Sequence, residues 1–389
     1  MDYLKRTQEL FDETVAHRRC LHQIPETGLE LPKTMDYLAR ALTDIGCNPI
    51  SCGGGLVAEL GNPGGKTVLL RADADGLPMD EESGLDFAAV KNAHTCGHDF
   101  HAAMLLTAAK LLKENEAALK GRVRLMFQPG EETFQGAKSM IAAGVLEDPK
   151  PDVALAYHVM AGRMPLGLVC YNRAGTMMNS SDNFTITITG RGTHGAYPDN
   201  GVDPITIAAH LILALESVVA RELKATQASV LTIGKMVAGD AGNIIPQTAT
   251  LCGTMRCDDP GQRAFLLERL HQVAEGTAAT HRGTATVTVT SGTPPLICDT
   301  AATDDFLGYM KELPVPGYRE HPNIRAAASE DWAAVLEQIP GSYLFLSAGF
   351  PDREVAPQHH PQVVFNEGVL AIGPAYLAHC ATRWLEEHC

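Results

Sequence analysis

Apolar and polar residues follow two distinct patterns along this chain, and each pattern occupies its own region. The first consists of short, nearly continuous apolar runs, which are typical of strands covered on both faces. These runs lie at residues 56–60, 67–70, 123–127, 153–156 and 343–346. Helical periodicity occurs around them, at residues 34–45, 102–112, 137–143 and 366–385. The alternation predicts an α/β domain with a mixed, largely parallel sheet and helices on both faces.

The second pattern is confined to the middle of the chain. Residues 184–189 and 286–290 alternate strictly between apolar side chains and threonine, as strands do when only one face is buried. Between them lie two helical stretches and two more strand-like runs, at 204–219, 261–279, 230–237 and 248–256. We therefore predict an inserted α+β domain at 179–293, with a four-stranded antiparallel sheet and two helices. Residues 1–178 and 294–389 would form one discontinuous domain.

Composition and charge exclude several classes of protein. The 389 residues exceed what one hydrophobic core usually organises, and a content of 45% hydrophobic and 20% charged residues is typical of globular proteins. The net charge of −15 disfavours nucleic acids and anionic membranes as partners. No stretch approaches eighteen consecutive apolar residues, and the polar start lacks the apolar segment of a secretory signal. We expect a cytoplasmic protein without a membrane span.

The ten cysteines have no repeating spacing, which indicates reduced thiols with metal ligation open to a few of them. One cysteine belongs to the segment His94-Thr95-Cys96-Gly97-His98-Asp99-Phe100-His101, directly before an apolar helix. Cys96 and His98 are two residues apart, and Gly97 lets the backbone turn tightly between them. The segment therefore favours a metal site, although a helix cap at Asp99 with incidental histidines is the alternative.

Acidic and imidazole side chains also follow the predicted strands. Glu131-Glu132 comes after the strand at 123–127, and Asp73 and Asp75 follow the strand at 67–70. Carboxylates at a buried strand end are costly unless a cation neutralises them, and open α/β sheets bind ligands at such ends. A metal bound by one glutamate would leave the other as a base, whereas an exposed acidic loop is the alternative. His158 follows the strand at 153–156, and His359 lies in a loop before the last helix. A lone histidine in either place more often packs or caps.

Two motifs for other chemistries do not fit. Residues 61–67, Gly-Asn-Pro-Gly-Gly-Lys-Thr, resemble a phosphate-binding loop, but the glycine spacing is one residue short and a strand follows where a helix is needed. A turn is the better interpretation of this segment. The Gly-x-Ser-x-Gly elbow of serine hydrolases is absent from the sequence. The residues therefore favour a metal centre, and neither a phosphate-binding loop nor a serine-hydrolase elbow is supported.

These motifs together resemble the aminoacylase/carboxypeptidase superfamily of dimetal hydrolases. Within it, the chain is most similar to the branch of hippurate hydrolase, N-acyl-amino-acid deacylases and indole-acetyl-amino-acid (auxin-conjugate) hydrolases. The resemblance runs nearly end to end. Its motifs are His17-Arg18-Arg19 through Pro25-Glu26, Arg71–Pro78, Cys96–His101, Phe127–Glu132, His158-Val159, His194–Pro198, Gly242–Pro246, Gly253–Arg256, Ser329–Trp332 and His359-His360-Pro361. It implies a zinc-exopeptidase-like catalytic domain and an inserted lid and dimerisation domain.

The resemblance also implies a role for individual residues. The metal ligands would be Cys96, His98, Glu132, His158 and His359. Glu131 would be the catalytic base, Asp75 would orient a ligand, and His194 would polarise the substrate carbonyl. Asn243 and Arg256 would contact the substrate, and Arg256 would bind the carboxylate of the substrate. Relatives carry small residues where Phe134 stands, so we expect Phe134 and Trp332 to shape the acyl pocket.

The implied activity is hydrolysis of the amide bond of N-acyl amino acids, with an acetyl, benzoyl or longer acyl group. Two divalent ions per subunit would take part, and the mixed thiolate, imidazole and carboxylate ligands suit Zn or Mn, with Co and Ni also compatible. The protein would act on a small molecule and form a homodimer through the inserted domain. A dipeptidase or carboxypeptidase of the same superfamily is the first alternative. A metal-free binding protein on the same fold is the remoter one.

Overall fold

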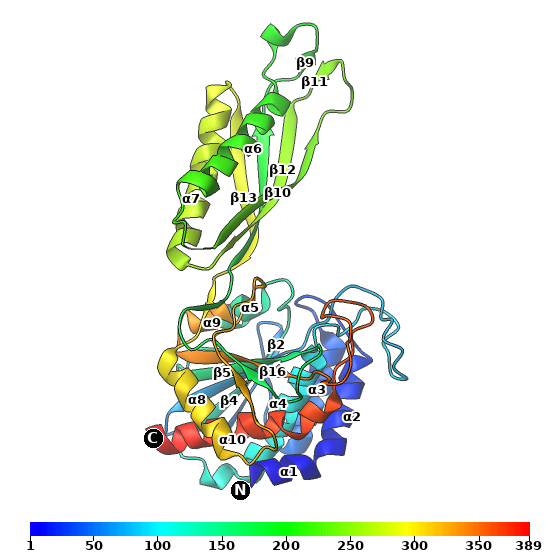
Figure 1. Cartoon of the computed structure of the whole chain (residues 1–389), viewed down its shortest axis with the longest axis vertical. Coiled ribbons are helices and arrows are strands. Elements are labelled where there is room, and N and C mark those ends of the chain that lie inside the picture. Colours follow the sequence, from blue (N-terminus) through cyan, green and yellow to red (C-terminus); the bar gives the residue numbers. More distant parts are fainter. Residues whose placement is uncertain (227) are drawn as a thin grey trace. The chain divides into compact units, whose positions relative to one another are not determined.

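The computed structural model describes residues 1–226 and 228–389, which form two compact units. Unit 1 comprises Met1–Met177, Ile297–Arg325 and Asp331–Cys389, and unit 2 comprises Met178–Leu296 and Ala326–Glu330. Both units are drawn in Figure 1, where the colours follow the sequence. The first and last parts of the chain therefore build one body, although more than a hundred residues separate them.

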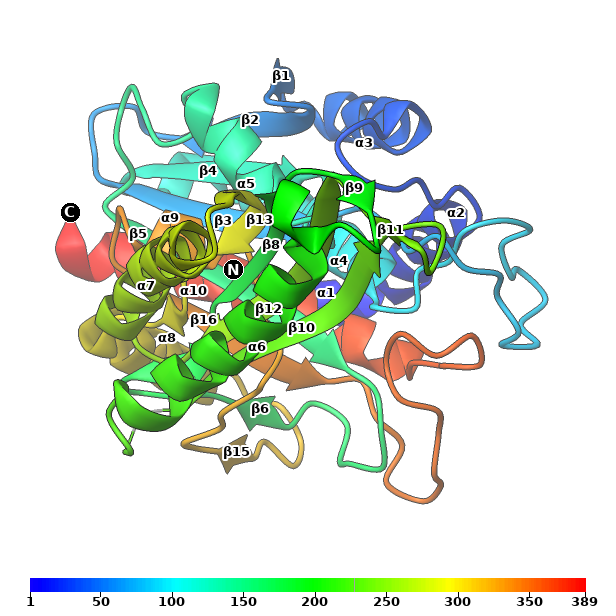
Figure 2. The ribbon, with the colours of Figure 1, turned by 90° about the horizontal axis from the view of Figure 1, so that it is seen from above.

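Unit 1 contains an eight-stranded sheet in the order β1-β2-β4-β3-β5-β16-β6-β15, which can be followed in Figure 2. Its strands are β1 (Ile50–Cys52), β2 (Gly55–Gly61), β3 (Thr67–Asp73), β4 (Arg122–Gln128), β5 (Val153–Met160), β6 (Val169–Cys170), β15 (Glu320–His321) and β16 (Gly341–Ser347). The four central strands, from β4 to β16, are parallel. Strands β1 and β2 run antiparallel to their neighbours, and β6 is antiparallel to β16 but parallel to β15. The predicted mixed, largely parallel sheet is confirmed.

Helices cover both faces of this sheet (Figure 1). The larger set is α1 (Tyr3–Glu9), α2 (Phe11–His22), α3 (Pro32–Ile45), α4 (His98–Glu114), α8 (Thr300–Glu312) and α10 (Gly373–His388). The other face carries α5 (Gly136–Ala142) and α9 (Ala333–Leu336), and the short helices η1 (Glu116–Ala118) and η3 (Glu367–Ala371) join elements. The fully buried side chains of Val68, Leu70 and Leu125 lie in one cluster with those of α4 and α10. Burial on both faces explains why these strands are continuous apolar runs.

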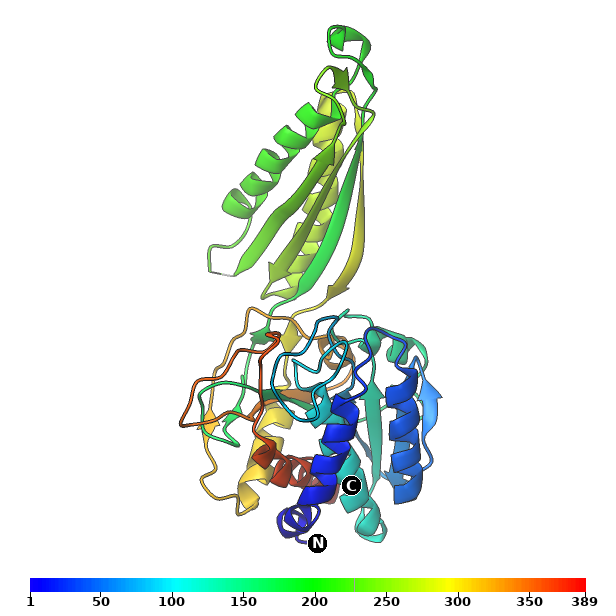
Figure 3. The same ribbon diagram turned by 90° about the vertical axis from the view of Figure 1, so that its right-hand side faces the viewer.

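Unit 2 is a four-stranded antiparallel sheet in the order β10-β12-β8-β13, with two helices on one face (Figure 3). The strands are β8 (Ser181–Thr189), β10 (Ser229–Ala238), β12 (Thr248–Cys257) and β13 (Thr284–Thr293), and the helices are α6 (Pro204–Arg221) and α7 (Pro260–Thr280). Phe184, Ile186 and Ile188 of β8 are buried against these helices, whereas the threonines between them are not. A small ladder pairs β9 (Thr193–His194) with β11 (Ile244–Ile245). The remaining short elements are β7 (Thr176–Met178), β14 (Leu296–Ile297) and η2 (Pro198–Asn200).

One helix of the described residues, α6, is long and apolar enough to cross a membrane by length and composition alone. Ile207, Leu211 and Leu215 of this helix are buried in the core of unit 2. The core helix of a soluble protein passes the same test, so a single helix of this kind is weak evidence for a membrane span.

Several element boundaries differ from the sequence-based expectation. The apolar helix predicted at 102–112 begins four residues earlier, at His98, so that two histidines of the motif lie in its first turn. The helix predicted at 366–385 is two helices, because the chain breaks at Ile372 and Pro374 stands in the first turn of α10. Helices α1, α2 and α8 carry no strong apolar periodicity and were not predicted.

Candidate metal centre

The parallel strands bring the polar motif residues to one edge of the unit 1 sheet. Asp73, the last residue of β3, pairs in register with Gln128, the last residue of β4. The segments that follow them, with Asp75 and with Glu131-Glu132, therefore start from the same edge. His158 lies near the end of β5, which is parallel to β3. These residues are far apart in sequence, and their proximity follows from the shared strand direction.

Helix α4 approaches the same edge with its first turn. Gly97 precedes it with a left-handed φ of 93°, and a Cβ at this position would lie only 2.5 Å from Cγ2 of Val159. Glycine is therefore required both for the turn and for the close approach to β5. The turn places Cys96 just before the helix and His98 at its first position, where His98 is fully buried.

The Cys96 sulfur is the central atom of a group of metal-capable side chains. It lies 3.3 Å from Nε2 of His158 and 3.2 Å from Nε2 of His359. That His359 nitrogen is also 3.4 Å from Oε1 of Glu132. Donor atoms of Cys96, His98 and Glu132 all lie within 4.8 Å of one another. The structure thus brings together all five residues that the sequence named as ligands, and their donors converge on the thiol.

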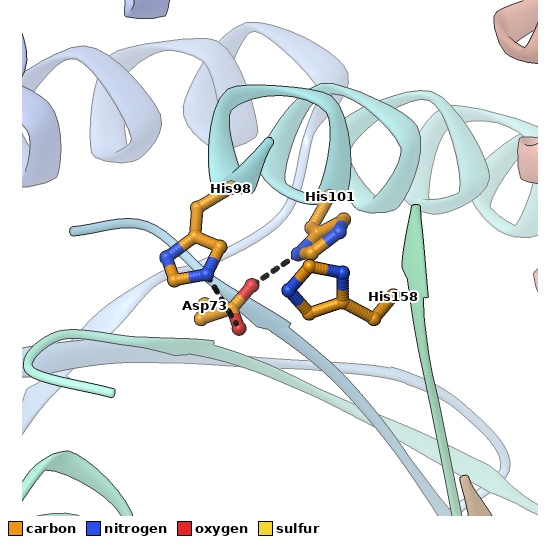
Figure 4. A group of neighbouring side chains, drawn as sticks. All are labelled: Asp73, His98, His101 and His158. Carbon is orange, nitrogen blue, oxygen red and sulfur yellow. Dashed lines mark hydrogen bonds and ion pairs between the residues drawn. The ribbon is translucent and has the colours of Figure 1, made fainter. Parts of the chain in front are cut away.

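Hydrogen bonds on the outer side of two histidine rings leave Nε2 of each facing this group. Nδ1 of His158 donates to the carbonyl oxygen of Val159 at 2.7 Å, and Nδ1 of His98 donates to that of Asp75 at 2.9 Å, by the tautomer that these acceptors require. Nε2 of His98 is buried and makes no hydrogen bond within the described residues, although it lies 3.5 Å from the Asp73 carboxylate, a contact drawn in Figure 4. When the ring is neutral, this nitrogen is an acceptor without a hydrogen-bond donor, and a metal ion would bind it. The residues therefore fit a metal.

The proton affinities of the same group are strongly perturbed. Hydrogen bonds with Cys96 and Glu132 raise the pKa of His359 to about 10. Burial raises the pKa of the Cys96 thiol. A metal ion that binds Cys96 and His359 would therefore have to displace a proton from each side chain.

Asp75 links two of the candidate ligands. Its Oδ2 accepts a hydrogen bond from the backbone N–H of Glu132 at 3.1 Å, and its Oδ1 lies 3.3 Å from Nδ1 of His98. The carboxyl group is fully buried, and burial raises its pKa. Asp75 is therefore placed to orient the His98 ring and the Glu132 backbone rather than to be a donor in the group around Cys96.

A second cluster, Asp73, His98, His101 and His158, lies behind the first and is drawn in Figure 4. Both ring nitrogens of His101 are occupied, since Nδ1 donates to Asp73 and Nε2 accepts the backbone N–H of Val159 at 2.9 Å. Nη1 of Arg71 lies 2.9 Å from the Asp73 carboxylate. His101 thus holds the end of β5 in place and has no spare ring nitrogen for a metal ion. Two different sequence motifs, Arg71–Pro78 and Cys96–His101, contain these residues, but their pairing was not predicted.

Glu131 and Phe134 form a tight turn after β4. The N–H of Phe134 donates to the carbonyl oxygen of Glu131 at 2.8 Å, and Phe134 has a φ of 55°, which is unusual for an aromatic residue. Glu131 is buried, and its Oε2 lies 4.0 Å from Nε2 of His98. The turn therefore directs the Glu131 carboxylate toward the metal-capable group.

Trp332 is fully buried and its ring lies 5.8 Å from the Arg71 guanidinium, so in this structure it offers no surface to a ligand.

Three other predicted site residues lie in unit 2. His194 of β9 pairs in register with Ile244, the residue after Asn243, and the N–H of Gly195 donates to the Asn243 carbonyl at 2.8 Å. His194 is exposed, and its Nδ1 accepts the N–H of Ala196 at 3.0 Å, which leaves Nε2 directed away from the backbone. Arg256 lies on β12, where its Nη1 donates to the carbonyl of Met255 at 3.0 Å. His194 and Asn243 are neighbours, whereas Arg256 belongs to a different part of the unit.

Comparison with known proteins identifies the family of this chain. The sequence model of peptidase family M20/M25/M40 matches residues 69–383. N-acetyl-L-cysteine deacetylase of Bacillus subtilis (strain 168) is 35% identical, over 97% of this chain and 89% of that protein. IAA-amino acid hydrolase ILR1-like 5 of Arabidopsis thaliana is 34% identical over 98% and 89%, and thermostable carboxypeptidase 2 of Saccharolobus solfataricus is 32% identical over 96% and 95%.

Solved structures agree with the sequence comparison. The YXEP protein of Bacillus subtilis, a dinuclear metal-binding peptidase of the M20 family, superposes with a TM-score of 0.79 at 29% identity, covering 97% of this chain and 99% of that one. A protein from methicillin resistant Staphylococcus aureus superposes with a TM-score of 0.92 at 28% identity over 100% of both chains. The zinc-exopeptidase-like fold with an inserted antiparallel unit is thereby confirmed. The chain belongs to peptidase family M20/M25/M40 and is a hydrolase that acts on amide bonds.

Proposed function

We propose that this protein is a metal-dependent amidohydrolase that cleaves N-acyl amino acids into a carboxylic acid and a free amino acid. The observation that carries the proposal is the convergence of Cys96, His98, Glu132, His158 and His359 beside the buried carboxylate of Glu131. Relatives named as an N-acetyl-L-cysteine deacetylase and an IAA-amino acid hydrolase support cleavage of this class of amide.

The five converging residues would hold two divalent ions. When bound, such ions supply positive charge that lowers the pKa of a water molecule and polarises an amide carbonyl. A thiolate with imidazoles and a carboxylate is a mixed donor set that suits Zn or Mn, with Co and Ni also compatible. The intact donor set argues against a metal-free binding protein on this fold.

Glu131 is the proposed base. Its carboxylate takes a proton from the attacking water and then gives it to the nitrogen of the leaving amino acid, so that no net proton is gained or lost by the protein. Asp75 orients His98 through the contact at 3.3 Å and holds the Glu132 backbone. Phe134, which follows the base in the same turn, would border the acyl group of the substrate.

Unit 2 would supply the substrate contacts outside the metal centre. We assign polarisation of the scissile carbonyl to His194, and contacts with the amino-acid part to Asn243 and Arg256. Arg256 would pair with the substrate carboxylate. In this proposal residues 1–178 and 294–389 are the catalytic domain, and residues 179–293 are the lid and dimerisation domain.

We also propose that the protein is a cytoplasmic homodimer. All ten cysteines are free thiols, as expected for a reducing compartment. The edge strand β10 exposes three apolar side chains, Val230, Met236 and Val237, with exposed fractions of 51%, 43% and 55%. An exposed apolar edge of this kind suits pairing with a second copy. A molar mass in solution equal to one chain would contradict the dimer.

A carboxypeptidase is the second candidate, because thermostable carboxypeptidase 2 is similar over nearly the whole chain. The metal-loaded protein should therefore be assayed on a matrix of acyl groups and amino acids, with free-amine dipeptides of the same C-terminal residues alongside. We expect kcat/KM for the best N-acyl amino acid to exceed that for the matched dipeptide by about tenfold or more. Higher activity on the dipeptides would replace the deacylase assignment with a peptidase. No activity on either class would refute both.

A further inference from the structure

A side-chain amide joins two of the segments that carry candidate ligands. The Nε2 atom of Gln358 donates to the carbonyl oxygen of Cys96 at 3.1 Å and to that of Val159 at 3.2 Å. It also lies 3.9 Å from the Cys96 sulfur. Cys96 precedes α4, whereas Val159 belongs to β5 and follows His158. Gln358 therefore bridges the turn before the helix and the end of the strand.

The chemistry of the amide matches its surroundings. An amide NH2 group has two donors and no acceptor, and the two carbonyl oxygens use one donor each. A carboxylate or an apolar side chain could not replace it, because both partners are acceptors and such side chains have no donor. The Val159 carbonyl accepts from Nδ1 of His158 as well, at 2.7 Å. Gln358 thus touches the carbonyl that sets the orientation of the His158 ring.

The next residue along the chain depends on the same contacts. His359 has a φ of 64°, which is a left-handed backbone conformation. Residues other than glycine adopt it only when their surroundings hold them there. Its N–H donates to the Thr95 carbonyl at 3.1 Å. Gln358 and His359 together therefore make hydrogen bonds with Thr95, Cys96 and Val159. These bonds hold His359 in a conformation that brings its Nε2 within 3.2 Å of the Cys96 sulfur.

We propose that Gln358 is a positioning residue of the metal centre. Its side-chain amide fixes the positions of the metal-binding atoms of Cys96, His158 and His359 relative to one another. This inference rests on the proposed metal site. Gln358 does not bind the ion itself in this assignment; it acts through the backbone of two ligand-bearing segments. Outer hydrogen bonds of this kind change metal affinity by about 10–100-fold.

Two variants and a matched control test the inference. Gln358→Met keeps most of the side-chain volume and removes both donors, and Gln358→Ala removes the whole group. Gln362→Ala is the control, because Gln362 lies four residues further along the same segment and its amide donates to Glu82 at 3.3 Å. Zn²⁺ affinity is measured by competition with a chromophoric chelator, together with the melting temperature of each metal-free protein and the absorption spectrum of each Co²⁺ form.

We expect both Gln358 variants to bind Zn²⁺ about 10–100-fold more weakly, with an altered thiolate-to-cobalt band and a metal-free melting temperature equal to that of the wild type. Gln362→Ala should match the wild type in all three measurements. Unchanged Zn²⁺ affinity in the Gln358 variants would overturn the inference alone. Weaker binding with a parallel fall in metal-free melting temperature would overturn it too, because Gln358 would then be a general structural residue. A wild-type protein that binds no divalent ion would instead overturn the proposed function.

Discussion

The thiol of Cys96 holds the central place among the candidate ligands, with histidine nitrogens at 3.2 and 3.3 Å. Burial raises the pKa of this thiol. Hydrogen bonds that His359 makes with Cys96 and Glu132 raise the pKa of His359 to about 10. Both groups must lose a proton before they can ligate a metal ion. Metal binding and proton release are therefore coupled at this residue.

Replacing Cys96 by alanine should remove bound metal, because the donor that contacts both histidines is lost. Cys20→Ala, at an exposed cysteine, should keep the metal content of the wild type. In the wild type the apparent affinity should rise about tenfold per pH unit for each proton released between about pH 6 and 8. Elemental analysis and chelator competition measure both effects. Full metal content in Cys96→Ala, or a pH-independent affinity, would contradict the assigned role.

At the scale of single residues, the family resemblance named the five residues whose donor atoms the structure brings together, and their role as ligands stays a prediction. The Asp73–His101 pair was not predicted, because it depends on which strand α4 packs against. A sequence signal existed, since His98 and His101 are three residues apart and share one face of a helix. The burial of Trp332 could not be predicted, because an aromatic residue in a loop can either line a pocket or fill the core.

Helix α4 begins at the metal centre, and its first turn needs a close approach of backbone to β5. Gly97→Ala should lower the free energy of unfolding by about 2–4 kcal/mol, because it adds both a left-handed backbone strain and a contact of 2.5 Å with Val159. Gly84→Ala is the matched control. Gly84 has a φ of 74° and no atom near its Cβ position, so only about 1 kcal/mol should be lost. Denaturant unfolding of both variants separates strain from contact, and equal losses would refute the steric argument.

A buried ionic network ties α2 to the first turn of α4. Nδ1 of His22 lies 2.8 Å from Asp99, and its Nε2 lies 3.0 Å from Glu81. Nε of Arg18 lies 2.7 Å from the same Asp99 carboxylate. Burial opposes the charged form of His22, but Asp99 and Glu81 outweigh it and raise the pKa of the ring. The folded protein therefore binds this proton more tightly than the unfolded chain does.

The stability that His22 contributes should be complete below its unfolded pKa of about 6.5 and should be lost as the pH rises through the folded-state pKa. His22→Leu should thus cost about 3 kcal/mol at about pH 6 and less in more alkaline solution. Burial lowers the pKa of His17. The stability that His17 contributes should therefore be complete above about pH 6.5 and should be lost as the pH falls below that value. Unfolding free energies of His22→Leu and His17→Leu across this range check the signs, and a loss at His22 that grows with pH would contradict the network.

At the scale of elements, pattern predicted the central strands well and helix ends poorly. The runs at 67–70 and 123–127 lie inside β3 and β4, since strands buried on both faces leave a clear apolar signal. The first turn of α4 was missed because His98 and His101 are polar residues buried for their chemistry rather than for their hydrophobicity. Strand β2 is antiparallel to β4, and this direction could not be predicted, because an apolar run does not indicate which strand it pairs with.

The whole molecule carries an excess of acidic side chains, with 46 Asp and Glu against 31 Lys and Arg. A few of these carboxylates, including Glu131, Glu132 and Asp75, lie at strand ends of unit 1 and account for the proposed chemistry. Hydrolysis of an anionic N-acyl amino acid by so acidic a protein requires local positive charge, which the metal ions and Arg256 would supply.

The central claim is that Glu131 acts as the base beside metal ions held by its neighbours. The most direct test adds Zn²⁺ or Mn²⁺ stepwise to metal-free protein and measures bound metal and hydrolysis of an N-acyl amino acid in the same samples, for the wild type and for Glu131→Gln. The account predicts that wild-type activity appears as two ions bind per chain. Glu131→Gln should bind the same two ions while its kcat falls by about 10²–10⁴-fold. Wild-type activity that is complete without metal, or a fully active Glu131→Gln protein, would contradict the account.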